Sequence, residues 1–178
     1  MDIDIKKAEL KDVFDISKLH AICWKDTYKN IIPDSYLKNI YLDDWCEEFE
    51  DGINNKTREA HIAYIDDKPI AVISHGKSRC DMEGYGEIIS LYVHPIYQCS
   101  GIGSLLLEHA VKYIKGLGYN NICLCVFDKN ERAKKFYEKN GFKDSGKKNT
   151  LKIENEDNFT LSDKQLKKLL DFLKSLNN

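Results

Sequence analysis

The alternation of apolar and polar residues predicts a strand at the start of the chain, followed by a helical region. Residues 2–7 alternate isoleucines with charged side chains, as in a strand with one buried face. Residues 9–29 carry apolar side chains at the spacing of an amphipathic helix. A second helical stretch is expected from Pro33, and a third from Asp43, with Trp45 and Phe49 directed inward.

The middle of the chain predicts a hairpin and then a strand, a helix and a strand. Residues 60–65 and 70–74 are β-prone runs joined by "DDKP", which favours a tight turn. Residues 87–94 form the most β-prone run, and a helix is expected over residues 103–115. Residues 121–127 predict a second buried strand, which should pair in parallel with the first across a right-handed crossover.

The last third of the chain predicts a short helix and a tail. "NERAKKFYEKNGF" should be helical and end at Asn140 and Gly141. The tail contains a short hairpin signal and then an amphipathic helix with a capping box at Ser162 and Gln165. The leucine face of this helix needs burial, either against the protein's own sheet or against a second copy, so a homodimer is one of two expected arrangements.

Length and charge narrow the class of protein. The 178 residues fit one domain, expected to span residues 1–178 with a core at about 1–145 and a tail at about 146–178. The net charge of -2 and the absence of a long apolar run predict no nucleic-acid partner, no membrane span and a cytoplasmic location. The six cysteines lack zinc spacing, so no metal is expected and the thiols should be reduced.

The stretch "QCSGIG" lies between a predicted strand and a predicted helix. A helix N-terminus there would offer backbone N–H groups and partial positive charge to a phosphate, with glycines allowing close approach. A turn without a ligand is the alternative. A P-loop is excluded because no Lys-Ser/Thr follows the glycines. A dinucleotide site is disfavoured because Leu106 occupies the place of the third glycine, although Asp128 would suit a ribose contact.

With its flanks, "LYVHPIYQCSGIGSLLLEHAV" resembles the acetyl-CoA loop of the GNAT N-acetyltransferases. "NERAKKFYEKNGF" is similar to a second landmark of that family, and "CWKDTYKNIIPDSYL" to its early helices. The resemblance covers about residues 1–145. It implies an α/β (α+β) fold, in which a central mixed, mostly antiparallel sheet is splayed between two parallel central strands and flanked by helices. The helix in the tail is an addition to the family pattern.

The resemblance also implies a donor site without a metal. Acetyl-CoA would enter the gap between the splayed strands. The backbone would pair with pantetheine at Leu91, Tyr92 and Val93. The pyrophosphate would lie on N–H groups of Gln98, Cys99, Ser100, Gly101, Ile102, Gly103 and Ser104. By the motif match, Asn130 would contact the pantetheine arm.

The resemblance places Tyr137 near the thioester sulfur, where its hydroxyl could protonate the leaving thiolate. A core tyrosine is the alternative. Glu87 would act as the base, directly or through water, unless it is only a solvated residue at a strand edge. Trp24 and Tyr28 would wall the acceptor pocket, and core packing is the simpler account of Trp24. The histidines are not assigned to the site.

The resemblance therefore implies an enzyme, expected to move an acetyl group from acetyl-CoA to a primary amine of a small molecule by direct attack in a ternary complex. Acetylation of a protein N-terminus or lysine is a close variant. A CoA-binding module that regulates without turnover is an alternative of another class.

Overall fold

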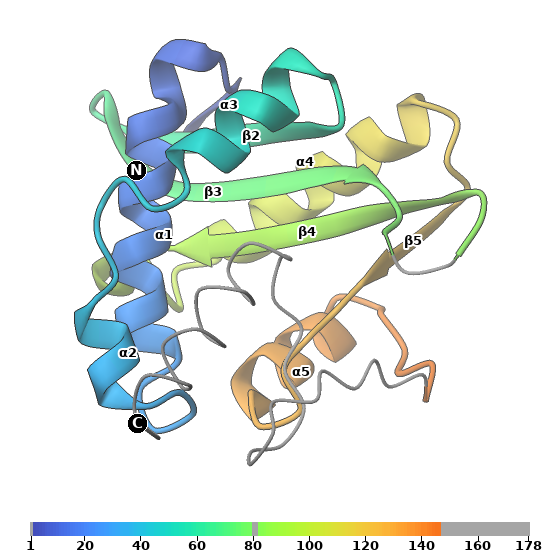
Figure 1. Cartoon of the computed structure of the whole chain (residues 1–178). Helices are drawn as coiled ribbons and strands as arrows, with labels where there is room; N and C mark the ends of the chain where they lie inside the picture. The colour runs from blue at the N-terminus through green and yellow to red at the C-terminus, as the bar shows by residue number, and fades with distance from the viewer. Residues whose placement is uncertain (1, 80–81, 147–178) are drawn as a thin grey trace, which may run out of the picture.

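The computed structural model describes residues 2–79 and 82–146 and shows one sheet flanked by helices (Figure 1). In these residues the sheet has five strands in the order β1-β2-β3-β4-β5. The strands are β1 Asp4–Lys7, β2 Arg58–Ile65, β3 Lys68–Lys77, β4 Tyr85–Val93 and β5 Asn121–Leu124. Neighbours are antiparallel except β4 and β5, which are parallel. The mixed, mostly antiparallel sheet is therefore confirmed.

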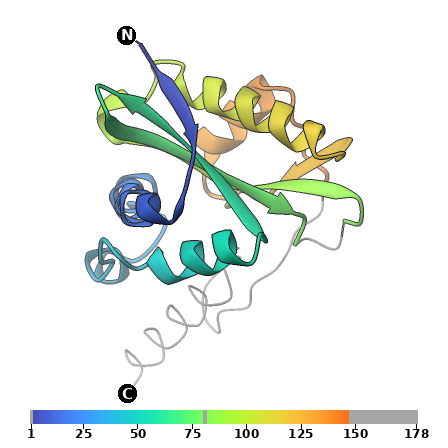
Figure 2. The ribbon, with the colours of Figure 1, turned by 90° about the horizontal axis from the view of Figure 1, so that it is seen from above.

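The helices cover both faces of the sheet, as Figure 2 shows. One face carries α1 Val13–Thr27, α2 Asp34–Lys38 and α3 Cys46–Asn54, and the other carries α4 Ile102–Gly116 and α5 Glu131–Lys139. Short 3₁₀ turns, η1 Leu10–Asp12 and η2 Pro95–Tyr97, precede α1 and follow β4. The third helix begins at Cys46 instead of the expected Asp43, because residues 41–44 form a turn in which Asp44 accepts from the Tyr41 N–H.

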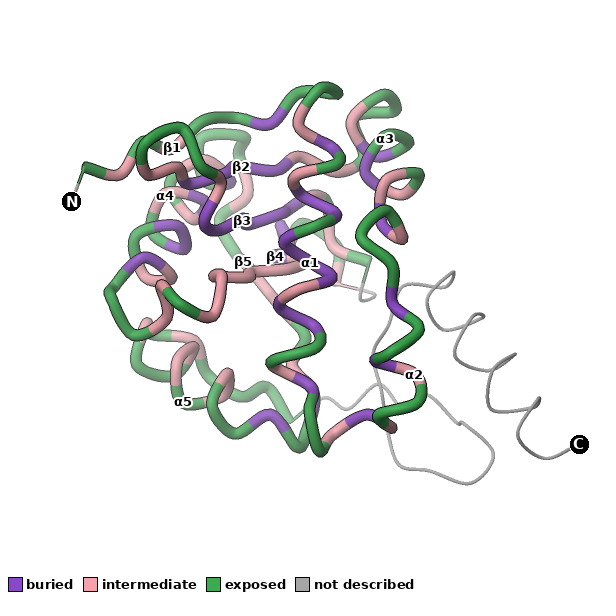
Figure 3. Tube along the Cα trace, turned by 90° about the vertical axis from the view of Figure 1, so that its left-hand side faces the viewer, coloured by how far each residue is buried: buried purple, intermediate pink, exposed green. Residues whose placement is uncertain are grey.

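Two apolar clusters fill the space between the sheet and its helices. Ile62 and Val72 pair across β2 and β3 and belong to the cluster under α1 and α3. Ala63 and Ala71 pair next to them and belong to the cluster under α4. β2 and β3 are thus buried on both faces over their middle residues (Figure 3), which explains their nearly continuous apolar sequence.

The turn between β2 and β3 confirms the predicted hairpin. Asp66 and Asp67 both have positive φ, 49° and 57°, as the two central residues of a type I′ turn require. Aspartate tolerates this left-handed conformation better than most residues. Both strands are longer than predicted, Arg58–Ile65 and Lys68–Lys77, and their register shifts between Ala63 and Tyr64.

The sheet opens between β4 and β5. The two strands pair only from Tyr85 with Asn121 to Ile88 with Leu124. On the other edge of β4, Ile89 is an extra residue, because Ser90 pairs with Ser74 while Ile88 pairs with His75. Such a bulge bends a strand and reverses its alternation of faces. β5 accordingly ends three residues before the predicted Phe127, and a gap opens beside the second half of β4.

The predicted tail hairpin, tail helix and leucine face lie outside the described residues. The single-domain organisation and the homodimer therefore stay predictions. In the described part of the chain, no helix is long and apolar enough to cross a membrane. The same residues contain no group of three or more histidine, cysteine or acidic side chains arranged to hold a metal ion.

Three buried histidines make stability depend on pH. His20, His61 and His75 are at most 3% exposed. Burial lowers the pKa of His20 to about 3 and the pKa values of His61 and His75 to about 4. Since an unfolded histidine titrates near pH 6.5, the unfolded chain binds more protons below that pH. Their contribution to stability is complete above about pH 6.5 and declines as the pH falls toward 4.

We expect the free energy of unfolding to fall by on the order of 2 kcal/mol per histidine between about pH 7 and pH 5. Urea unfolding at both pH values measures this change. His61→Phe keeps a ring against Tyr113, 4.7 Å away in the native pair, but removes a titrating group. This variant should therefore lose about 2 kcal/mol less between the two pH values. Equal stability of the native chain at both pH values would contradict the account.

Candidate active site

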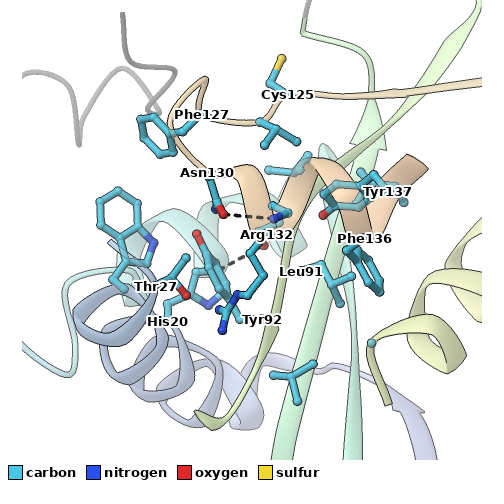
Figure 4. A pocket seen from close by; sticks show the side chains of 18 of the residues that line it. His20, Thr27, Leu91, Tyr92, Cys125, Phe127, Asn130, Arg132, Phe136 and Tyr137 are labelled. Carbon is cyan, nitrogen blue, oxygen red and sulfur yellow. Dashed lines mark hydrogen bonds between the residues drawn. The ribbon is translucent and has the colours of Figure 1, made fainter. Parts of the chain in front are cut away.

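A cavity of about 900 Å³ lies where β4 and β5 separate. Figure 4 shows its walls: His20 and Thr27 come from α1, Leu91 and Tyr92 from β4, and the side chains on the opposite wall from α5 and the segment before it. Most of the residues selected from the sequence line it: Trp24, Tyr28, Glu87, Leu91, Tyr92, Val93, Gln98, Cys99, Gly101, Gly103, Ser104, Asn130 and Tyr137. The Ser100 hydroxyl instead donates to the Tyr97 carbonyl, and the Ile102 side chain is buried in the core.

The loop before α4 lines this cavity at Gln98, Cys99 and Gly101. Cys99 and Gly101 have positive φ, 60° and 87°, and direct the chain from β4 into the helix. The first N–H groups of an α-helix have no acceptor within the helix, and the ladder of α4 begins with the Leu105 N–H donating to the Gly101 carbonyl. Such groups, together with the helix dipole, are suited to binding an anion.

Gln98 connects three elements at the mouth of the cavity. Its side-chain N–H₂ donates to the Val93 carbonyl at 3.1 Å and to Asp26 at 3.4 Å. Its side-chain oxygen accepts from Arg132 at 2.6 Å. Arg132, which lies in α5, thereby places a positive charge beside the loop that precedes α4. Sequence reasoning missed Arg132, because its partner lies 34 residues away.

Asn130 caps the helix that carries Tyr137. Its side-chain oxygen accepts from the Ala133 N–H at 3.1 Å, and the residue is 8% exposed. Capping of this kind satisfies one of the first N–H groups of α5. The amide nitrogen of the same side chain carries two N–H donors that suit a ligand carbonyl.

Tyr137 is half-buried on α5 and lines the cavity. Its ring lies 5.1 Å from that of Phe136 and 5.8 Å from that of Phe142, both edge-on. Burial raises the pKa of its hydroxyl well above the ordinary value. The hydroxyl therefore stays protonated at neutral pH and is a hydrogen-bond donor.

Glu87 is buried, with 1% exposure, so a solvated strand-edge role is wrong. Arg79 holds both carboxylate oxygens: Nη2 donates to Oε1 at 2.7 Å, Nε to Oε2 at 3.2 Å, and the backbone N–H to Oε2 at 2.8 Å. A guanidinium fork of this kind is among the stronger ion pairs in proteins. These three donors occupy three of the four lone-pair positions of the carboxylate, and Oε1 retains one for water or substrate.

Aromatic side chains form the wall on the α1 side. Trp24 and Tyr28 are 4% and 7% exposed, so they belong to the core and still line the cavity. Trp24 lies 5.4 Å from Trp45, and Tyr28 lies 4.8 Å from Phe127. The Tyr28 and Tyr92 hydroxyls are 3.3 Å apart, and burial raises the pKa of Tyr28 to about 12. This wall is apolar and uncharged, with two hydroxyls.

His20 also lines the cavity, although sequence reasoning left it aside. Its ring lies 4.7 Å from that of Tyr92, and its Nε2 is 3.1 Å from the Ser90 hydroxyl. The two residues are 70 positions apart, so no local pattern could have joined them.

In the described residues, a mixed sheet opens between two parallel strands, and the start of α4 lies at the gap. Residues 18–142 match the model of the Acetyltransferase (GNAT) family, and the chain belongs to this family. It is an N-acetyltransferase, an enzyme of the acyltransferase class.

Individual relatives agree with this family. The uncharacterized N-acetyltransferase YuaI of Bacillus subtilis (strain 168) is 29% identical over 131 residues, which cover 72% of this chain and 73% of the relative. The structure of PaiA N-acetyltransferase from Thermoplasma acidophilum in complex with coenzyme A has a TM-score of 0.68 and 27% identity, covering 80% of this chain and 91% of that one. A predicted acetyltransferase from Clostridium acetobutylicum with acetyl-CoA shares the fold, with a TM-score of 0.68, 22% identity and coverage of 87% and 99%.

Proposed function

We propose that this enzyme transfers the acetyl group of acetyl-CoA to a primary amine of a small molecule, by direct attack in a ternary complex. One observation carries the proposal: the part of β4 beyond its pairing with β5, the start of α4 and Tyr137 all line a single cavity. The relative from Thermoplasma acidophilum, which was solved with coenzyme A, supports the choice of donor.

The donor would lie along the second half of β4. In the described residues, pairing with β5 stops at Ile88, so this edge of β4 would offer backbone groups within residues 91–93 to the amides of pantetheine, although the Val93 carbonyl already accepts from Gln98. The pyrophosphate would then reach the N–H groups of residues 98–104, with Arg132 adding positive charge. Ser100 and Ile102 would contribute through their backbone alone, because their side chains are engaged elsewhere.

The chemistry needs few side chains. The amine nitrogen bonds to the acetyl carbonyl carbon, the carbon–sulfur bond breaks, and the nitrogen gives up one proton. Tyr137, which stays protonated, would donate its hydroxyl hydrogen to the departing sulfur. Glu87 would receive the amine proton through a water bound at the second lone pair of Oε1. This arrangement supplies an acid and a base on different walls of the cavity.

The shape of the acceptor side favours a small molecule over a protein segment. The walls are concave and built largely from buried aromatic rings, as is usual for small-molecule sites. Two carboxylates face the cavity, and each is ion-paired to an arginine: Glu87 to Arg79 at 2.7 Å and Glu48 to Arg58 at 2.5 Å. Such a lining suits an amine on an apolar or aromatic body.

Free-thiol release from acetyl-CoA, measured across a panel of alkyl, arylalkyl and amino-sugar amines, tests the proposal. We expect amine-dependent release that saturates in both substrates. Calorimetric titration with coenzyme A, run in parallel, reports binding without turnover. Tight binding with no thiol release for any amine, or no binding at all, would contradict the proposed function.

A further inference from the structure

A chain of three hydrogen-bonding side chains leads from the core to the wall of the cavity. Ser74, fully buried on β3, has its hydroxyl 2.6 Å from the Ser90 hydroxyl on β4. The Ser90 oxygen is in turn 3.1 Å from Nε2 of His20 on α1. His20 Nδ1 lies 2.9 Å from the Ile16 carbonyl oxygen. His20 and Ser90 line the cavity, and Ser74 lies behind them.

The bond between His20 and the Ile16 carbonyl determines which group donates in each of these hydrogen bonds. A carbonyl oxygen only accepts, so Nδ1 of His20 must carry the hydrogen and donate. In a neutral imidazole the other nitrogen then has only its lone pair, so Nε2 accepts from Ser90. Since the Ser90 hydrogen is used in that bond, the 2.6 Å bond is made by the Ser74 hydroxyl donating to Ser90.

The histidine stays neutral in this setting. It is 3% exposed, and the rings of Trp45, Phe49 and Tyr92 lie within 5.7 Å of it. Burial, together with the positive charge of Arg58, lowers its pKa to about 3. The donor and acceptor roles of Ser74, Ser90 and His20 therefore stay the same from about pH 5 to pH 8.

This leaves the Ser90 oxygen with one lone pair and no hydrogen to offer. A hydroxyl has one donor and two acceptor positions, and Ser74 and His20 take one of each kind. The bulge at Ile89 places Ser90 on the cavity side. Ile88 and Leu91 both pack toward α4, although residues three apart in a regular strand lie on opposite faces. Ser90 therefore faces α1, as Tyr92 does. The cavity wall thus carries a fixed hydrogen-bond acceptor at this point.

We propose that the Ser90 hydroxyl binds the N–H of the acceptor amine, and that His20 is the positioning residue that keeps the Ser90 hydrogen turned away from the cavity. The inference rests on the proposed function and adds a specificity residue on the acceptor side. Ser90 accepts a hydrogen bond and takes no proton, because His20 behind it is too weak a base. The amine nitrogen is oriented with its lone pair free for the acetyl carbon.

Ser90→Ala and Ser74→Ala form a matched pair for the test. Both variants remove the 2.6 Å hydrogen bond, but only the first removes the oxygen that faces the cavity. For the panel amine with the fastest turnover, we expect Ser90→Ala to lower kcat/KM for the amine by about 5- to 10-fold, as for loss of one neutral hydrogen bond. The KM for acetyl-CoA should not change. Ser74→Ala should stay within about 2-fold of the native enzyme.

Two replacements of His20 separate positioning from packing. His20→Gln can place an amide oxygen where Nε2 lies and so still accept from Ser90. His20→Asn is too short to reach Ser90. Selective loss of amine kcat/KM in His20→Asn, with recovery in His20→Gln, is the expected result. Equal losses in both, or equal losses in Ser90→Ala and Ser74→Ala, would overturn the inference in favour of a structural role.

A measurement that needs no acceptor distinguishes this inference from the proposed function. Nitrogen-15 NMR of labelled histidine reports which ring nitrogen carries the hydrogen, with His20→Gln supplying the assignment. We expect the Nδ1–H form of His20 from about pH 5 to pH 8. The Nε2–H form, or an imidazolium in this range, would overturn the inference even if amines are acetylated. An amine panel without turnover would instead refute the proposed function.

Discussion

Replacing Gly103 by valine is expected to weaken coenzyme A binding by about 100-fold, or about 2.7 kcal/mol. Gly103 lies in the first turn of α4 and lines the cavity. A Cβ at this position would lie 3.4 Å from the Phe136 ring and 3.7 Å from Val93, which both line the cavity, so a valine side chain would crowd this part of the cavity wall. There it would separate the phosphates from the N–H groups of the loop, whose charge-assisted hydrogen bonds contribute roughly 1.5–3 kcal/mol each.

Gly116→Val is the matched control, because Gly116 ends the same helix and a Cβ there meets no atom within 4 Å. Calorimetric titration with coenzyme A should give the native dissociation constant for Gly116→Val and the weakened one for Gly103→Val. Thermal unfolding confirms that both variants are folded. Native affinity in a folded Gly103→Val enzyme would show that the start of α4 does not hold the phosphates.

Tyr137→Phe is expected to lower kcat by about 100-fold, the lower end of the range for general acid–base groups. The substitution keeps the ring contacts with Phe136 and Phe142 and removes only the hydroxyl. Coenzyme A affinity should therefore stay within about 3-fold, because the hydroxyl is needed when the carbon–sulfur bond breaks. Steady-state kinetics at saturating acetyl-CoA, with calorimetry for coenzyme A, separates the two quantities.

The control for this variant is Tyr41→Phe, in which a tyrosine that is 66% exposed loses its hydroxyl. Its kcat should equal that of the native enzyme. If Tyr137→Phe also retains native kcat, another donor serves the leaving thiolate. If instead its coenzyme A affinity falls along with kcat, the hydroxyl acts in binding and the assigned role is wrong.

Local sequence predicted those parts of the fold that depend on neighbours in the chain. Period-two alternation located β1, the two aspartates of the hairpin turn located β2 and β3, and Gly141 marked the end of α5, where its φ is 88°. The bulge at Ile89 was missed, because an extra residue in β4 is defined by its partners on β3. The early end of β5 has the same cause, since it depends on where β4 turns away.

The candidate site likewise has one side that local sequence could predict and one side that it could not. The donor side lies in two continuous segments, the loop before α4 and the start of α5, so a motif could select its residues. The acceptor side is assembled from α1, α3, β2 and β4, and its polar pairs join distant positions. Glu87 was selected without Arg79, and Ser90 and His20 were not joined, because the ion pair and the hydrogen bond form only when the strands and helices pack.

The most direct test of the account is mass spectrometry of an acceptor amine after incubation with acetyl-CoA that carries carbon-13 in its acetyl group. The account predicts a labelled amide on the amine, one free thiol for each amide formed, and loss of both in Gly103→Val at limiting acetyl-CoA. Labelled acetate without labelled amide, or thiol release that does not depend on the amine, would contradict it.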